Sequence, residues 1–492
     1  MLFLNDCIRC RCGCEQIGLL AWLTVSHIRI FNHYIPAPQL LLSVIELGLL
    51  FAAVVVANML RFQWSDGIEW QWSWVVSGIV YSVVILACTY AMGVYRAAYV
   101  DGFGAMVVRT IVAYCLLGCS FLTVFFYLLP EYAMWRGVLL LSIITSLLFI
   151  VPFRWVYYKL VNIQAMANCC LVLGTGKRAA RLASALESRH PKVANVAAFI
   201  QMHEGDECVV TGKVIPYTGN LVDIAREMDV GEIVVAVDSR RESDGTLFPL
   251  DDLLECKLSG VKVSEAITFY EREFGILELE EIKPGWMVFT AGFNSNWFWQ
   301  MLKRFGDIVI ALVILLLAWP LMVLAALAIL VEDRGPFIYS QTRVGAGGKP
   351  FQILKFRSMR VDAEQDGVAV WAGANDDRVT RVGAVLRNTR VDELPQLYNV
   401  LRGEMSIVGP RPERPEFVDN LNREIPFYAE RHRAKPGLMG WAQLNYPYGA
   451  STEDAARKLS YDLYYVKNRS LLLDLIIMVQ TVQIILLGTG VR

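Results

Sequence analysis

The sequence has few charged residues and almost no net charge. Lysine plus arginine total 46, aspartate plus glutamate total 47, and together they make up 19% of the 492 residues. The chain as a whole therefore lacks a basic field that could hold nucleic acid by neutralising its phosphates, and we expect no nucleic-acid partner. Any site for an anionic ligand has to be built locally.

Cysteine is scarce outside the first half of the chain. Four of the 11 cysteines lie within residues 7–14, and none follows Cys256. This distribution disfavours a disulfide framework. A metal site at Cys7-x2-Cys10 is disfavoured too, because neither a second CxxC pair nor a histidine pair follows at ligand spacing.

Apolar residues are abundant instead. They make up 55% of the chain, and the mean hydropathy of +0.41 is too high for a water-soluble globular protein. Four apolar stretches, 40–60, 72–95, 110–129 and 137–153, each approach the roughly 20 residues that a helix needs to cross hydrocarbon. Most of the arginine and lysine residues that flank the four stretches fall on the same side of the membrane. By the positive-inside rule, this predicts that both ends of the four-stretch segment are cytoplasmic.

Glu46 interrupts the first of these stretches. A charged side chain at the centre of a bilayer costs about 2.5–3.5 kcal/mol on insertion scales. We expect Glu46 to face another helix. A role in handling lipid or protons is the alternative, since intramembrane carboxylates often mark a functional site.

From about residue 168 the pattern changes to short strands and helices. Strands are expected at 169–173, 196–200 and 232–237 and a helix at 179–186, an alternation typical of a parallel α/β sheet. The spacing of Gly174, Gly176 and Ala179 could bring backbone N–H groups to a phosphate, but no acidic residue follows about 20 positions on to hold a ribose. A nucleotide site and a non-catalytic accessory domain both stay open.

The stretch 308–331 is long enough to span a membrane, but Pro320 lies in its middle. Proline removes a backbone hydrogen bond and clashes with the preceding turn, so a sharp kink is expected. We predict a re-entrant helix-break-helix that enters and leaves through one leaflet, with Lys303 and Arg304 snorkelling at the entry and the charged residues 332–334 at the exit. An ordinary fifth span is the alternative.

Two cations follow in the stretch 351–359. Lys355 and Arg357 share one face of the expected strand, because side chains alternate with period two. Two cations on one face suit a diphosphate, although such a face is more often simply solvated.

The segment Asp392-Glu393-Leu394-Pro395 is the most informative one. Pro395 fits only the first turn of a helix, so both carboxylates fall at or beside a helix N-terminus. Adjacent residues do not project in one direction, which disfavours a proton shared between them. One carboxylate could act as a nucleophile toward phosphorus while the other holds Mg²⁺. Two acids that merely complement a helix dipole are the alternative.

Arg387 and Arg411 favour the catalytic interpretation. Arg387 precedes Asp392 closely, and Arg411 stands between Pro410 and Pro412, whose fixed φ angles limit its orientation. Cations that converge on a pair of metal-binding carboxylates are typical of phosphoryl transfer.

The last apolar run, 471–487, is interrupted by Asp474 and by uncharged polar residues. This pattern predicts a helix that lies in the membrane interface. A helix of a soluble core is the alternative.

Together these segments resemble the large monotopic phosphoglycosyl transferases of the bacterial sugar transferase family, also called polyprenyl-phosphate hexose-1-phosphate transferases. Within them, the sequence is most similar to the exopolysaccharide type associated with exosortase systems. The resemblance covers nearly everything from His27 onward. It rests on the segments Lys303-Arg304-Phe305-Gly306-Asp307, Gly335-Pro336-Phe337, Gln341-Thr342-Arg343-Val344-Gly345, Lys355-Phe356-Arg357-Ser358-Met359, Asp392-Glu393-Leu394-Pro395-Gln396 and Val408-Gly409-Pro410-Arg411-Pro412-Glu413-Arg414-Pro415.

The resemblance implies that Asp392 attacks the β-phosphate of a UDP-hexose, releases UMP and passes the hexose phosphate to undecaprenyl phosphate. It implies that Glu393 binds Mg²⁺ and that four cations face the substrate phosphates: Lys355, Arg357, Arg387 and Arg411. It also implies a homodimer in the bacterial inner membrane, with membrane lipid around the Pro320 region and the catalytic domain in the cytoplasm. Met439 departs from the family pattern, because relatives usually carry threonine there.

The expected fold is that of a membrane protein with three parts after a short arm. The arm covers 1–38, with 1–24 a candidate mis-start. The three parts that follow are a four-helix transmembrane bundle (39–160), a Rossmann-like α/β accessory domain (168–290) and a monotopic α/β catalytic domain (298–492) with a re-entrant membrane helix (305–332).

Two other functions fit the layout less well. A membrane-bound NAD-dependent nucleotide-sugar dehydratase would need a Tyr-x3-Lys dyad, and none of the 20 tyrosines has a lysine four residues later. A non-catalytic scaffold for polysaccharide assembly is the other alternative, and it requires that Asp392 and Glu393 be inert.

Overall fold

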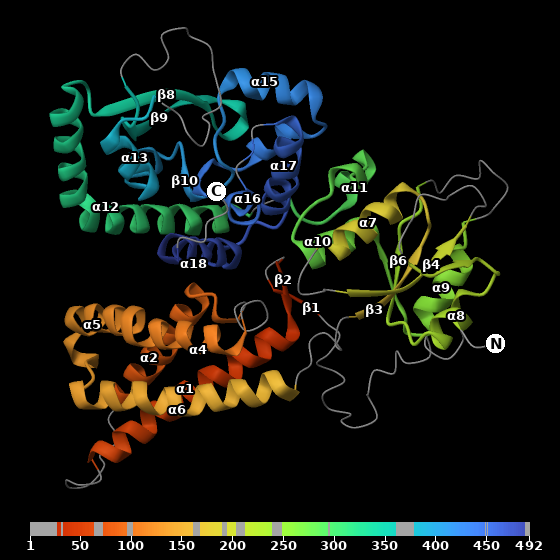
Figure 1. Ribbon diagram of the computed structural model, residues 1–492, viewed down its shortest axis with the longest axis horizontal. Helices are drawn as coiled ribbons and strands as arrows, with labels where there is room; N and C mark the ends of the chain where they lie inside the picture. The colour runs from red at the N-terminus through yellow and green to blue at the C-terminus, as the bar shows by residue number, and fades with distance from the viewer. Residues whose placement is uncertain are drawn as a thin grey trace. The chain divides into compact units, whose positions relative to one another are not determined.

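The computed structural model describes residues 27–30, 33–62, 72–95, 102–160, 168–188, 194–202, 212–238, 248–293, 296–360, 378–447, 449 and 451–487. The chain forms two compact units, one of Met1–Arg29 with Tyr34–Phe274 and one of Ile30–His33 with Gly275–Arg492 (Figure 1). The cysteine cluster at 7–14 and the candidate mis-start at 1–24 lie outside the described residues.

The first unit opens with apolar helices. They are α1 (Ala37–Phe62), α2 (Trp72–Ala91), the continuous helix made by α4 (Phe103–Val112), a π-helical turn (Ala113–Gly118) and α5 (Cys119–Leu128), and α6 (Arg136–Leu160). In the described chain, five helices are long and apolar enough to cross a membrane, and these are four of them. The four predicted apolar stretches are thus confirmed as helices, and the chain is a membrane protein. Two short strands, β1 (His27–Ile30) and β2 (His33–Pro36), precede α1.

A buried ion pair joins α1 to α6. Arg154 on α6 donates from Nε to Oε1 of Glu46 (2.5 Å) and from Nη2 to Oε2 (2.7 Å), and both side chains are almost fully buried. The Tyr95 hydroxyl donates to the same carboxylate, and Thr110 accepts from Arg154. The expectation that Glu46 faces another helix is confirmed. Its partner, Arg154, lies 108 residues away in the sequence.

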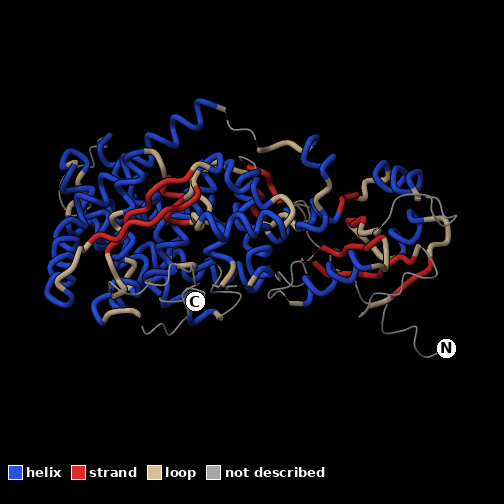
Figure 2. Tube along the Cα trace, turned by 90° about the horizontal axis from the view of Figure 1, so that it is seen from above, coloured by secondary structure: helices blue, strands red, loops and turns tan. Residues whose placement is uncertain are grey.

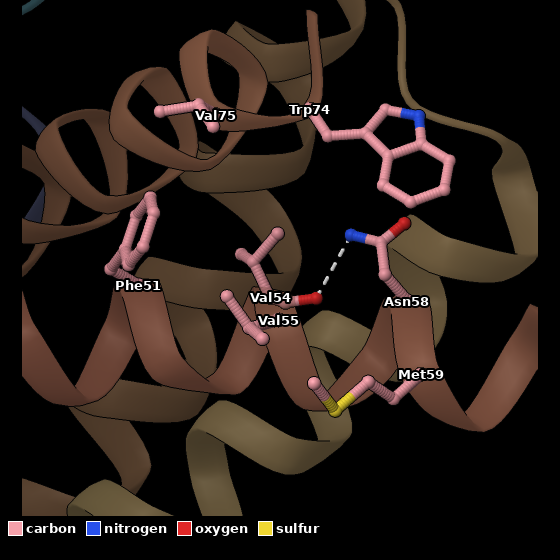
Figure 3. A pocket seen from close by; sticks show the side chains of 7 residues that line it. All are labelled: Phe51, Val54, Val55, Asn58, Met59, Trp74 and Val75. Atoms are coloured by element: carbon pink, nitrogen blue, oxygen red, sulfur yellow. Dashed lines mark hydrogen bonds between the residues drawn. The ribbon is translucent and has the colours of Figure 1, made fainter. Parts of the chain in front are cut away.

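A small cavity of about 20 Å³ lies between α1 and α2 (Figure 3). Its lining is almost entirely apolar, and the one amide in it, Asn58, donates back to the Val54 carbonyl of its own helix (3.0 Å). A space of this size holds at most about one water molecule, so it is a packing gap and no ligand site.

The α/β part of the first unit is a five-stranded parallel sheet in the order β5-β4-β3-β6-β7. The strands are β3 (Asn168–Leu173), β4 (Ala194–Gln201), β5 (Val214–Pro216), β6 (Glu232–Val235) and β7 (Lys262–Glu265). Helices α7 (Lys177–Glu187), α8 (Leu221–Glu227), α9 (Leu250–Leu258) and α10 (Ala266–Phe274) connect or follow them, and Figure 2 shows the strands in red. The predicted parallel sheet and its first strands and helix are confirmed.

The second unit contains the longest helix, α12 (Trp297–Asp333), with α11 (Pro284–Phe289) before it. After α12 come β8 (Ile338–Val344), β9 (Pro350–Phe356), α13 (Arg381–Asn388), α14 (Gln396–Arg402), β10 (Ser406–Val408), α15 (Pro415–Glu424), β11 (Gly437–Met439), α16 (Trp441–Asn445), α17 (Thr452–Lys467) and α18 (Leu471–Leu487). β8 and β9 form an antiparallel hairpin, and β10 pairs in parallel with β11.

Helix α12 bends instead of breaking. Its 37 residues form one helix with Pro320 inside it, and Figure 1 shows the two halves running in clearly different directions. Proline explains the bend, since it removes one hydrogen bond without ending the helix. The prediction of a helix-break-helix is therefore wrong in one respect, because no interruption of helical structure separates the halves.

Both ends of α12 contact the same domain. Near the start, Lys303 donates to Asp474 on α18 (2.7 Å), and Asp307 accepts from Ser406 on β10 (3.1 Å). Near the end, Glu332 accepts from the backbone N–H of Val382 on α13 (3.1 Å). A straight helix of this length would extend about 55 Å, so the bend is what brings both ends to one domain.

The prediction that Lys303 and Arg304 snorkel toward lipid headgroups is wrong. Arg304 donates to the backbone carbonyls of Val400 (2.5 Å) and Leu401 (2.7 Å), in the last turn of α14. Carbonyls at a helix C-terminus lack partners within the helix, and the guanidinium supplies them.

We expect that Arg154→Leu, which leaves Glu46 as an uncompensated buried charge, lowers the free energy of unfolding by about 3–5 kcal/mol. The double variant with Glu46→Leu should recover much of that loss, because two apolar side chains remove the charge altogether. Thermal unfolding of the purified protein in detergent measures both. A double variant no more stable than Arg154→Leu would contradict a coupled pair.

Candidate functional site

The carboxylates lie where α14 begins. Val391–Glu393 form a 3₁₀ turn, and Pro395 immediately precedes α14 with φ −60°. Arg390, which enters the turn, has a left-handed backbone with φ 60°. The prediction that Pro395 marks the helix start and places both acids beside it is confirmed.

A large, strongly basic cavity opens beside this turn. Its volume is about 540 Å³. The cations on its wall are Arg343, Lys355, Arg357, Arg360, Arg378, Arg387, Arg390, Arg411, Arg414, Arg431 and Lys458, and the acids are Asp392, Glu413 and Asp462. All four predicted phosphate-facing cations therefore share one wall with Asp392. The excess of positive charge favours an anionic ligand.

Glu393 is held by three cations. Its Oε1 accepts from Arg411 Nη2 (2.9 Å) and lies 3.7 Å from Lys355 Nζ and 3.6 Å from Arg390 Nη1. Burial alone would raise the pKa of Glu393, but the three cations outweigh it and lower the pKa to about 2. Glu393 is therefore ionised at every physiological pH.

Asp392 has the opposite environment. Its side chain is 7% exposed, and its Oδ1 is buried with no hydrogen-bond partner in the described structure. Burial first and the neighbouring Glu393 second raise the pKa of Asp392, against the attraction of nearby cations. Two adjacent carboxyls are thus driven apart in pKa, as expected for groups with different roles.

Lys355 on β9 is the lysine whose pKa is lowered most strongly by this site. Burial, and then the repulsion of Arg411, lower its pKa to about 8, although Glu393 opposes the change. An ammonium group with a pKa of about 8 is largely charged at neutral pH and loses its charge in mild alkali.

Arg357 is held at the end of β9. Its Nη2 lies 3.1 Å from Asp333 at the end of α12, and both terminal nitrogens are buried without a hydrogen bond in the described structure. A side chain at Gly335 would meet this guanidinium, which would then have to shift. Arg387 donates from Nε to the Ser358 hydroxyl (3.0 Å).

The Arg411 loop is supported by a residue that the sequence analysis missed. Buried Arg431 donates from Nη2 to the Arg411 carbonyl (2.9 Å) and pairs with Asp462 on α17 (2.7 Å). Arg390 was missed as well, and only its position beside Asp392 could have indicated it. Nothing local indicated Arg431, because its partners are distant in sequence.

Unpartnered buried atoms gather on the cavity wall. Within the described residues, the buried side-chain atoms without a hydrogen bond include Arg343 Nε, Arg357 Nη1, Asp392 Oδ1, Arg431 Nε and Gln443 Oε1, all from residues that line the cavity. Buried polar groups are normally satisfied, so this wall is arranged to be completed by a polar ligand.

The acid pair fits a hard divalent cation. The described residues contain no group of three or more histidine, cysteine or acidic side chains close enough to hold a metal. Mg²⁺ does not need such a cage, because it commonly takes one or two carboxylates together with substrate phosphates and water. The unpartnered Asp392 Oδ1 and the Glu393 carboxylate, which accepts a hydrogen bond from Arg411 at Oε1, supply suitable oxygens.

The glycine loop after β3 is a weaker candidate. The backbone N–H groups of Lys177 and Arg178, at the start of α7, donate to the two carboxylate oxygens of Asp238 (2.8 and 2.9 Å). A side chain at Gly176 would collide with that carboxylate. The position where a nucleotide phosphate would bind is therefore filled by the protein's own anion.

Comparison with known proteins shows that the part of the chain that forms the basic cavity matches a protein family. Residues 298–488 match the model of the family described as bacterial sugar transferase. The chain is 48% identical over 194 residues to a UDP-N-acetylgalactosamine-undecaprenyl-phosphate N-acetylgalactosaminephosphotransferase of Aeromonas hydrophila, covering 39% of this chain and 46% of that protein. It thus spans about half the length of that relative.

Two further relatives are covered more completely. A putative undecaprenyl-phosphate N-acetylgalactosaminyl 1-phosphate transferase of Bacillus subtilis is 54% identical over 26% of this chain and 72% of its own length. An undecaprenyl-phosphate galactose phosphotransferase of Salmonella typhimurium is 31% identical over 70% of this chain and 74% of its own length. The region matched by the family model contains the whole cavity wall. The chain belongs to the bacterial sugar transferase family.

Proposed function

We propose that this protein transfers a hexose 1-phosphate from a UDP-hexose to undecaprenyl phosphate, as the first membrane step of exopolysaccharide synthesis. The names of the relatives support undecaprenyl phosphate as acceptor and a UDP-sugar as donor. The observation that carries the proposal is the contrast between the two adjacent carboxyls. Glu393 is neutralised by three cations, whereas Asp392 presents an unpartnered buried oxygen.

The reaction proceeds in two displacements at one phosphorus atom. An Asp392 oxygen bonds to the β-phosphorus of the donor, the bond from that phosphorus to the bridging oxygen breaks, and UMP leaves with the electron pair. A phosphate oxygen of undecaprenyl phosphate then attacks the same phosphorus, which restores the Asp392 carboxylate and yields the lipid diphosphate sugar. Covalent catalysis of this kind divides one difficult step into two.

The cations of the wall neutralise the charge that makes an anionic nucleophile and a diphosphate repel each other. Lys355 and Arg411 pair with Glu393, which is adjacent to Asp392 in the sequence, and Arg357 and Arg387 line the same cavity as Asp392. Such fixed positive charge stabilises a transferring phosphoryl group without reorganisation. Mg²⁺, held by Glu393 and substrate phosphates, would add charge neutralisation of the same kind.

We assign α12 to one leaflet as a re-entrant helix. Its exposed apolar side chains, among them Leu316 (72%) and Leu317 (75%), require lipid around its middle. Both of its ends bind the domain that carries the cavity, which a fifth full crossing would not allow. The alternative of an ordinary span is thereby disfavoured. Chemistry then occurs at the cytoplasmic face of the inner membrane, where a dissolved donor meets a lipid acceptor.

The remaining parts are assigned as a four-helix transmembrane bundle and a Rossmann-like accessory domain. The Asp238 carboxylate, which accepts from the backbone N–H groups at the start of α7, supports an accessory domain that does not bind a nucleotide. The length and apolar character of α18 are consistent with a helix at the membrane interface. The homodimer stays a prediction from the resemblance.

Asp392→Asn should abolish UMP release, because an amide oxygen is a poor nucleophile and cannot restore the carboxylate. The measurement is UMP formed from radiolabelled UDP-sugars with undecaprenyl phosphate and Mg²⁺. Asp419→Asn on the exposed surface of α15 is the matched control and should retain wild-type turnover. Full activity of Asp392→Asn would exclude Asp392 as the nucleophile, whereas a wild type that releases no UMP would favour the scaffold alternative.

The pH dependence of kcat/KM for UMP release should be bell-shaped. The rate rises as Asp392 ionises, at a pH above the ordinary aspartate pKa of 3.8, and falls as Lys355 loses its proton near its pKa of about 8. Lys355→Arg should move the alkaline limb to higher pH, since a guanidinium stays charged there. An alkaline limb unchanged in Lys355→Arg would assign it to another group.

Single cysteines at Asn296 and Arg334, in a chain whose native cysteines are replaced by serine, should both react with a membrane-impermeant maleimide from the cytoplasmic side only. These positions flank the two ends of α12. A cysteine at Leu316, in lipid, should stay unlabelled. Labelling of Arg334→Cys from the opposite side would show a full crossing and contradict the re-entrant arrangement.

A further inference from the structure

We propose that Asn399 is a positioning residue that fixes Lys355 against the Asp392–Glu393 turn. Asn399 lies in the first turn of α14, six residues after Glu393, and is 1% exposed. It does not line the cavity within the described structure, so it acts through other residues. The proposal rests on the proposed function, because the transfer reaction is what the positioning serves.

The Asn399 amide binds the backbone of β9 at two points. Its Oδ1 accepts from the N–H of Leu354 (3.1 Å), and its Nδ2 donates to the carbonyl of Gln352 (2.7 Å). These two backbone groups lie on the edge of β9 that β8 does not use, since a residue and its second neighbour point their backbone groups the same way. The amide therefore takes the place of a neighbouring strand.

This contact is the hydrogen-bonded link between α14 and β9 in the described chain. Lys355 directly follows Leu354, and its Nζ reaches Glu393 at 3.7 Å without a short hydrogen bond to hold it. The separation of ammonium and carboxylate is thus set by the backbones that carry them, and Asn399 fixes one backbone to the other.

Helix α14 is itself fixed from the other side. Arg304 of α12 donates to the carbonyls of Val400 and Leu401, directly after Asn399. Glu404 accepts a further bond from Asn399 Nδ2 (2.7 Å) and orients the amide. The membrane helix, the nucleophile turn and the strand with Lys355 are joined in series, and Asn399 is the last connection.

The test is the split between kcat and KM in Asn399→Ala. Without the amide, β9 is released from α14, and the Lys355 ammonium is no longer fixed beside Glu393. We expect kcat to fall about 10- to 100-fold, since small misplacements in a phosphoryl-transfer site have effects of that size, while KM changes by less than about 3-fold. A merely structural role would lower the melting temperature and leave kcat of the folded enzyme close to wild type.

Asn468→Ala is the matched control, because Asn468 is equally buried and lies outside the described cavity wall. It should lower the melting temperature but leave kcat of the folded enzyme close to wild type. Asn399→Asp serves if the alanine variant does not fold, because it keeps the acceptor for Leu354 but loses the donor and faces the Glu404 carboxylate. Its kcat should also fall, and adding Glu404→Gln should restore kcat part of the way, because the glutamine amide can donate to the new carboxylate.

The outcomes separate the inference from the proposed function. If the wild type releases no UMP, the proposed function fails. If the wild type is active, but the folded Asn399 variants keep the wild-type kcat, then the positioning role alone is refuted.

Discussion

A carboxylate buried among cations is the interaction on which the site depends. Glu393 draws Lys355, Arg390 and Arg411 to one oxygen, and in doing so brings together a strand, a turn and a proline-flanked loop. Because Glu393 is the most enclosed member of the set, its charge would be costly if left unpaired. Asp392, one residue away, then stands in a field of fixed positive charge while keeping an oxygen free of hydrogen bonds.

The second constraint is the bent helix that joins lipid to this site. Exposed apolar residues cover the middle of α12, whereas its charged residues at both ends contact the catalytic domain. The motif Lys303-Arg304-Phe305-Gly306-Asp307 thereby acquires a structural meaning. Its charged members bind backbone and side-chain partners on α14, β10 and α18, which fixes the membrane helix to the helix beside the carboxylates.

Support of the reactive groups comes from behind the cavity wall. Arg431 holds the backbone of the Arg411 loop and is itself held by Asp462. On the opposite side, Asn399 ties β9 to α14. Supporting hydrogen bonds of this kind matter because positioning and electrostatic stabilisation supply most of the rate acceleration in phosphoryl transfer.

The sequence alone determined what depends on local chemistry. Length and apolar composition located the membrane helices, Pro395 located the start of α14, and Pro320 located the bend, because each acts within a few residues of itself. The same locality allowed Asp392 and Glu393 to be singled out. Only the tertiary structure decided the partners: Arg154 for Glu46, Arg431 for the Arg411 loop and Asn399 for β9. Hydrogen bonds and ion pairs reach only a few ångströms, so no pattern along the chain indicates which distant residues folding will bring within that reach.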